Sequence, residues 1–148
     1  MDGVSAVFAV VSLGVQLAGT IQATSDFLRS VQNAPDELLR LVDLLDQLQG
    51  TLGHVRDLVE QQSSVLTSPG SLRSIAAALQ NCEKSLKKLK SLVDQLKRSL
   101  HRQHRIQRAW ASLRTVLNKE ELLELRKQIQ ESLITLQLSI SINSAQLQ

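Results

Sequence analysis

Residues 72–100 read LRSIAAALQNCEKSLKKLKSLVDQLKRSL and hold the strongest periodic pattern in the chain. Their apolar residues recur at alternating steps of three and four, which is the spacing of a heptad seam on a helix. The members of this seam are Leu72, Ile75, Leu79, Cys82, Leu86, Leu89, Val93, Leu96 and Leu100. Because charged residues flank the seam, the pattern predicts a long helix over residues 69–102 that buries one side against other helices.

Two further segments carry the same spacing. In residues 36–64 the seam is Leu38, Leu41, Leu45, Leu48, Leu52, Val55 and Val59, and in residues 119–145 it is Leu122, Leu125, Ile129, Leu133, Leu136 and Ile140. Asn118 and Glu121 have the form of a capping box that opens the last helix. Residues 136–142 alternate apolar and polar side chains, which suits a strand as well as a helix. We expect helix there because these residues continue the register.

These patterns predict an all-α fold, a four-helix-bundle-like single domain over residues 1–148 with an apolar N-terminal helix and one additional short helix. The expected helices span about 4–31, 36–64, 69–102, 105–117 and 119–145, and the short one carries Trp110. Gly50 and Gly53 weaken the second helix in its middle by roughly 1 kcal/mol each relative to Ala. A bend or a close helix crossing is expected at that point.

The N-terminal helix has no charged residue between Asp2 and Asp26, and residues 3–25 read GVSAVFAVVSLGVQLAGTIQATS. One face, formed by Val4, Phe8, Val11 and Val15, is predicted to pack against the bundle. A second row consists of Gly3, Ala6, Val10, Gly14 and Ala18, and rows of small residues are common where helices meet inside lipid. A helix that is apolar on most of its circumference belongs in protein or in membrane. From the residues alone, a buried helix of a soluble bundle is favoured over one that exchanges into lipid.

The charge of the chain is unevenly distributed. Residues 84–114 hold ten basic residues and a single acidic one, Asp94. Those predicted to form a basic face outside the leucine seam are Lys84, Lys87, Lys88, Lys90, Lys97, Arg98, Arg102 and Arg105. A solvated helix face is the usual explanation. Anionic lipid is the other partner considered, whereas nucleic acid is disfavoured because aromatic residues are not interleaved with the basic ones.

No motif for chemistry emerges from the sequence. Gly14 and Gly19 fall within a predicted helix and follow no strand, so no phosphate-binding loop is expected. The lone Cys82 lies on a core seam, which suits a small buried residue in a reducing, intracellular compartment. We therefore expect neither enzyme activity nor a metal site, a cofactor or a small-molecule substrate.

Two stretches carry a resemblance to a known family. They are MDGVSAVFAVVSLGVQLAGTIQ at the N-terminus and RAWASLRTVLNKEELLELRKQIQESLITLQLSI after the basic segment. With them, essentially the whole chain resembles the HeLo-like domains at the N-termini of fungal NLR/STAND receptors. These domains are similar to the HeLo domain of the HET-S prion-forming system and to the N-terminal bundle of the mixed-lineage kinase domain-like protein.

The resemblance implies an executioner of programmed cell death in fungal innate immunity and heterokaryon incompatibility. Such a domain is cytoplasmic at rest, oligomerises on activation, and permeabilises the plasma membrane through its N-terminal helix. The residues implied for membrane insertion are Gly3, Ala6, Phe8, Gly14 and Ala18. The basic face would then hold anionic lipid or a partner. The alternative function is a protein–protein interaction or signalling bundle without membrane activity.

Overall fold

The computed structural model describes residues 3–31, 34–62, 69–102 and 118–146. They form the helices α1 (Gly3–Arg29), α2 (Asp36–Gln62), α3 (Pro69–Arg102) and α5 (Lys119–Gln146). No strand occurs within these four ranges, so the predicted all-α fold is confirmed. The short helix expected over residues 105–117, with Trp110, lies outside the described residues.

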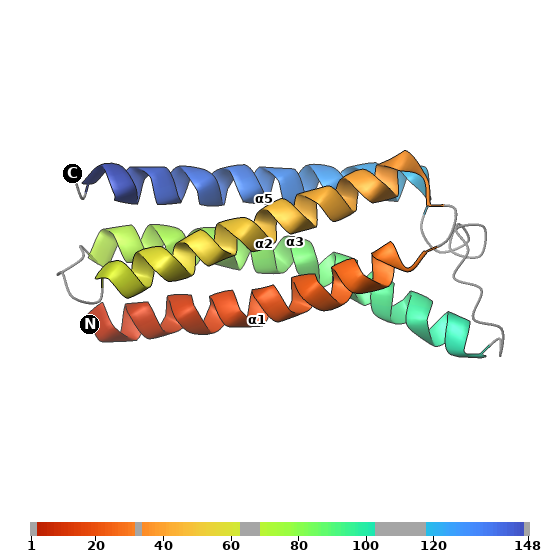
Figure 1. The fold of residues 1–148 in the computed structure, drawn as a ribbon, viewed down its shortest axis with the longest axis horizontal. Helices are drawn as coiled ribbons and strands as arrows, with labels where there is room; N and C mark the ends of the chain where they lie inside the picture. Colours follow the sequence, from red (N-terminus) through yellow and green to blue (C-terminus); the bar gives the residue numbers. More distant parts are fainter. Residues whose placement is uncertain (1–2, 32–33, 63–68, 103–117, 147–148) are drawn as a thin grey trace.

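The four described helices form an elongated bundle and lie roughly along its long axis (Figure 1). Helices α1 and α3 run in one direction, and α2 and α5 run in the other. Helix α1 packs along α2 and α3, and α5 packs along the same two helices. Thus α1 and α5 occupy diagonally opposite corners, as do α2 and α3. Helices α2 and α3 are therefore consecutive in the sequence but are not neighbours in the bundle.

The three leucine seams build the core. Every predicted seam residue of α2 is buried, and so are those of α3 from Leu72 to Leu96. In α5 the seam is buried from Leu122 to Leu136, while Ile140 is partly buried. Their heptad spacing keeps one stripe of each helix facing its partners, which is why the prediction succeeded. The alternating segment at the end of α5 is helical, as expected, because the buried Leu136 and Ser139 continue its inward side.

Local signals fix where the helices begin. The backbone amide of Glu121 donates to Asn118 Oδ1 at 2.8 Å, and Asn118 Nδ2 donates to Glu121 Oε1 at 3.4 Å. These two contacts confirm that Asn118 caps α5. At the start of α2, the Pro35 carbonyl accepts from the amides of Leu38 and Leu39 at 3.0 and 3.2 Å. Both helices begin at the same end of the bundle, where Lys119 Nζ lies 3.7 Å from Glu37 Oε1.

The predicted inward face of α1 is wrong. Phe8 is 73% exposed and Val15 is 64% exposed, whereas Val10, Leu17 and Ile21 are almost completely buried. Val11, at 36%, is also exposed, and the side chain of Val4 lies outside the described residues. Spacing alone does not select a face on a helix that is apolar nearly all round. The core takes the row with the long aliphatic side chains of its C-terminal half, because burying those removes the most apolar surface from water.

The expected close crossing at the α2 glycines is also wrong. Helix α2 continues from Asp36 to Gln62 through both of them. A Cβ atom added at Gly50 or Gly53 would meet no neighbouring atom within 4 Å. Thus neither glycine permits a close approach of another helix.

Candidate functional site

The N-terminal half of α1 presents apolar side chains to solvent. We call Phe8, Val11 and Val15 the exposed α1 strip. By length and composition, residues Val7–Arg29 are apolar enough to cross a membrane, and α1 is the one described helix for which this is so. Core helices of soluble proteins pass the same test, but they are mostly buried, whereas only 22% of an apolar 18-residue window of this segment is buried in the bundle. Helix α1 therefore covers the core with one side and leaves an apolar side uncovered.

The residues expected to act together in membrane insertion are separated by the structure. Phe8 belongs to the exposed α1 strip, whereas Gly14 and Ala18 face α2 and line a groove. The side chains of Gly3 and Ala6 lie outside the described residues. The small row of α1 therefore borders another helix of the bundle, Phe8 points outward, and Val11 and Val15 lie at the edge of the groove, partly open to solvent.

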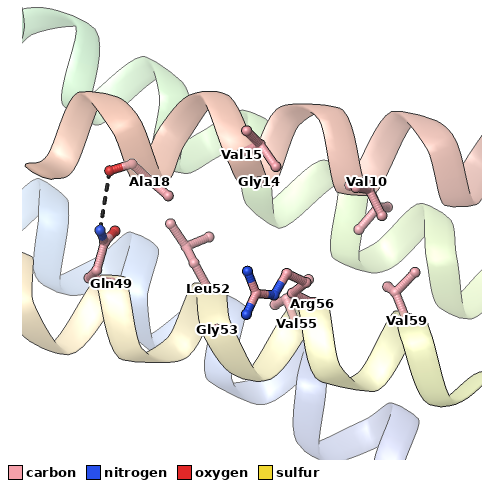
Figure 2. Close-up of a pocket in the computed structure, with 11 residues that line it drawn as sticks. Val10, Gly14, Val15, Ala18, Gln49, Leu52, Gly53, Val55, Arg56 and Val59 are labelled. Carbon is pink, nitrogen blue, oxygen red and sulfur yellow. Dashed lines mark hydrogen bonds between the residues drawn. The ribbon is translucent and has the colours of Figure 1, made fainter.

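The groove between α1 and α2, which we call the α1–α2 groove, has a volume of about 210 Å³. Its walls are mainly aliphatic, and Gly14 on α1 and Gly53 on α2 leave room between them (Figure 2). At one end, Gln49 Nε2 donates to the carbonyl oxygen of Ala18 at 3.2 Å. The other amide atom, Gln49 Oε1, is buried without a hydrogen-bond partner among the described residues. Only one of the two polar atoms of the Gln49 side-chain amide therefore has a hydrogen-bond partner among the described residues.

The C-terminal half of α1 is held more firmly. Phe27 and Leu28 are buried, and Lys97 Nζ of α3 lies 5.5 Å from the centre of the Phe27 ring. The Arg29 guanidinium pairs with Asp46 of α2 and lies 3.9 Å from Asp26. The hydrogen bond to Asp46 raises the pKa of Arg29. Both charged groups are about half exposed, so this pair adds little to stability on its own, but it fixes the end of α1 beside α2.

The basic face is solvent-exposed along α3, as predicted for Lys84, Lys87, Lys88, Lys90, Lys97 and Arg98. The side chain of Arg102 and the whole of Arg105 lie outside the described residues. Lys84, Lys87 and Lys88 border an open depression that Leu125 of α5 also lines. None of the ion pairs between described residues involves a member of this face. Helices α1 and α3 are neighbours, but Val11 and Val15 of the exposed α1 strip border α2, whereas Lys84, Lys87 and Lys88 border α5.

Cys82 has the environment of a core residue. It is buried on the α3 seam, and its Sγ donates to the Ser132 carbonyl of α5 at 3.8 Å. Burial raises the pKa of the Cys82 thiol to about 11. The thiol is therefore neutral and poorly nucleophilic at physiological pH. Within the described ranges, no three His, Cys, Asp or Glu side chains gather in a way that would hold a metal ion.

Sequence reasoning missed the α1–α2 groove and the pairing of Arg29 with Asp46. The helices' seams gave no signal for either, because both depend on how two helices are set against each other. The small residues Gly14, Ala18 and Gly53 were visible in the sequence. Their spacing could not show that they would meet across an unfilled space.

The architecture defines a small all-α domain whose first helix is apolar and largely uncovered. Residues 11–136 match the model of the SesA family, described as the N-terminal domain on NACHT_NTPase and P-loop NTPases. The chain therefore belongs to the SesA family. No curated protein and no solved structure matches the chain. An N-terminal domain of an NLR-type protein, as the sequence resemblance implied, is confirmed at this level, and the closer likeness to HeLo domains stays a prediction.

Proposed function

We propose that this domain is the effector domain of an NLR-type receptor and that it permeabilises membranes through α1, in the manner of the HeLo-like domains it resembles. The observation that carries the proposal is that α1 spans 27 residues, has no charge before Asp26, and displays Phe8 and Val15 to solvent. A solvent-exposed Phe on an uncharged helix is an unfavourable surface for a protein that acts alone in water. A lipid phase or neighbouring copies would cover it.

The exposed α1 strip would enter lipid before the rest of the helix. In this mechanism the N-terminal half of α1 needs little release, because much of its apolar surface is already free. The C-terminal half of α1 is harder to release from the bundle, since burying side chains such as Leu17, Ile21 and Leu28 stabilises the bundle by about 1.5–3 kcal/mol each. Clustered copies at a membrane would offset that cost by offering lipid and other α1 helices to the released surface.

The basic face would hold the domain on anionic lipid while α1 inserts. Each Lys or Arg near such a surface contributes roughly 1 kcal/mol, so several lysines on one face of α3 act together. Their freedom from ion pairs with described residues leaves these charges available. The proposed domain is cytoplasmic at rest and moves to the plasma membrane on activation, where it forms homo-oligomers.

Leakage of a dye from anionic vesicles tests the role of the exposed α1 strip. The variant combines Phe8→Glu with Val15→Glu, which places charge on the side of α1 that would meet lipid. The matched control combines Ile134→Glu with Leu138→Glu, because these side chains are 48% and 58% exposed on α5, at the opposite corner of the bundle. We expect the α1 variant to lose leakage and the α5 variant to keep it, with the same helical content and cooperative melting in both. Equal leakage from the two variants would exclude α1 as the agent.

The second candidate function is an interaction bundle without membrane activity. The α1–α2 groove beside the exposed α1 strip favours it, because a partner protein could cover both at once. In that case the domain would not sediment with anionic vesicles. A protein partner would instead be retained at low salt and released at high salt, since the basic face would meet an acidic surface.

A further inference from the structure

The α1–α2 groove is an open hollow between two neighbouring helices that their side chains leave unfilled. Protein interiors are as dense as crystals of small organic molecules, and gaps between neighbouring helices are usually filled by side chains. Here Gly14 and Ala18 on α1 lie across from Gly53 on α2, and none of the three reaches into the space. A Cβ atom built on Gly14 or Gly53 would touch nothing within 4 Å. The volume of about 210 Å³ is therefore available to something other than the described residues.

The chemistry of the groove is apolar along its length, with one cationic group beside it. Val10 and Val15 come from α1, and Leu52 and Val59 come from α2. Figure 2 shows the guanidinium of Arg56 between the two helices, next to this aliphatic wall. Arg56 takes part in none of the ion pairs between described residues. Ligand sites commonly combine apolar walls with a few polar groups that orient the ligand.

We propose that the α1–α2 groove binds a free fatty acid, with the alkyl chain along the groove and the carboxylate at Arg56. The groove is smaller than the roughly 300–1,000 Å³ of sites for drug-sized ligands, which fits one narrow chain better than a ring system or a two-chain lipid. From Arg56 to Gln49 the groove runs two turns of α2, about 10 Å at the rise of an α-helix. A chain of medium length spans this distance and ends where Gln49 closes the groove on Ala18.

If α1 leaves the bundle as the proposed function requires, a ligand in the groove would affect that step. Its walls come from α1 and α2 together, so a bound fatty acid contacts both helices only while α1 lies in the bundle. A ligand that binds one state of an equilibrium stabilises that state. The fatty acid would therefore hold α1 in place and oppose its transfer to lipid.

The test measures binding of decanoate to the whole domain by calorimetry, in the absence of vesicles and below the concentration at which decanoate forms micelles. Gly53→Leu fills the groove from within, and Gly50→Leu is its control because Gly50 lies on the same helix but outside the groove. We expect one saturable site in the parent protein and in Gly50→Leu, with affinity lost in Gly53→Leu. Equal affinity of the two variants would overturn the site.

A second pair of variants tests the orientation of the ligand. Arg56→Gln removes the charge beside the groove, and Arg73→Gln removes an exposed charge from α3 as the control. A hydrogen-bonded charge pair is worth enough to predict about tenfold weaker decanoate binding for Arg56→Gln. Decyltrimethylammonium, a cation with a chain of the same length, should bind poorly to the parent protein. Comparable binding of the anion and the cation would instead indicate unspecific adsorption, for example to the exposed α1 strip, and would overturn the proposal.

These measurements are independent of membrane activity. If decanoate binds in the groove but the domain leaks no vesicles, the site stands and the proposed function fails. If vesicles leak but decanoate does not bind, the proposed function stands and the site fails. If both hold, saturating decanoate should slow leakage by the parent protein and leave leakage by Gly53→Leu unchanged.

Discussion

At the scale of single residues, the positions where a side chain is missing are as informative as those where one is buried. Gly53 sits in the interior of α2, where glycine costs up to about 1 kcal/mol relative to alanine because the unfolded chain gains more freedom. Contacts with neighbouring helices do not offset this cost in free energy, since no neighbour comes within 4 Å of the place where a Cβ would lie. Retaining glycine here keeps the groove open at a cost in stability.

The first prediction follows from this cost. Gly53→Ala should increase the free energy of unfolding by about 0.5–1 kcal/mol, because alanine favours the helix and its methyl group meets open space. Urea denaturation followed by circular dichroism measures the change, and Gly50→Ala should behave in the same way. A destabilised Gly53→Ala protein would mean that the two helices approach more closely than the structure has them.

The second prediction concerns the proton on Cys82. Its pKa is raised to about 11 in the folded protein, against about 8.5 for an exposed thiol in the unfolded chain. Above the lower value the unfolded chain releases this proton while the folded protein keeps it. The contribution of Cys82 to stability is therefore present below pH 8.5 and is lost as the pH rises toward 11.

Denaturation of the parent and of Cys82→Ala at a series of pH values isolates this effect, because all other groups are common to both proteins. The stability difference between them should shift in favour of the alanine variant as the pH rises above about 8.5. A difference that stays constant with pH would show that the thiol is not buried in the folded state.

At the scale of elements, α1 differs from the other three described helices in what determines which of its sides is buried in the core. Helices α2, α3 and α5 each have one apolar stripe, so their spacing determined which residues became the core. Helix α1 has apolar residues on nearly every side, and its two possible faces differ in side-chain size rather than in polarity. The longer Leu17, Ile21 and Leu28 are buried, and Phe8 is left outside because it lies on the opposite side of the helix.

The third prediction distinguishes these two faces. Ile21→Ala should cost about 2–5 kcal/mol, because it removes fully buried atoms and leaves a cavity. Val15→Ala should change the free energy of unfolding by less than about 0.5 kcal/mol, since that side chain is mostly exposed. Chemical denaturation of both variants checks the assignment. If Val15→Ala destabilised the protein more than Ile21→Ala, the inward face of α1 expected from the sequence would be correct.

How far the sequence predicts the structure depends on whether a feature lies within one helix or between two. The three leucine seams, the cap at Asn118 and the solvent exposure of the described basic residues of α3 are properties of single segments, and they were predicted correctly. The inward face of α1, the α1–α2 groove and the pairing of Arg29 with Asp46 depend on the rotation and spacing of packed helices. Periodicity along one chain segment contains no information about these quantities.

At the scale of the whole molecule, the bundle joins one firmly held half of α1 to one that is largely uncovered. The C-terminal half is tied to α2 through Arg29 and to α3 through Phe27, whereas the N-terminal half carries the exposed α1 strip and borders the unfilled groove. The basic face occupies the adjacent corner. This arrangement suits a helix that leaves the bundle from its N-terminal end, which is the step that the proposed function requires.

A crosslinking experiment addresses that step. In a Cys82→Ala background, Ala18→Cys and Gln49→Cys are joined by a short bis-maleimide, which ties α1 to α2 where Gln49 already contacts the Ala18 carbonyl. The control joins Ser74→Cys to Ser139→Cys, whose native hydroxyl oxygens lie 3.3 Å apart, and so ties α3 to α5 without touching α1.

Leakage of anionic vesicles by these two crosslinked proteins, each compared with its own uncrosslinked form, is the most direct measurement of whether α1 must leave the bundle. We expect the α1–α2 link to abolish leakage and the α3–α5 link to leave it intact. If the protein with α1 tied to α2 leaks vesicles as fast as its uncrosslinked form, permeabilisation does not require α1 to leave the bundle and the proposed mechanism fails.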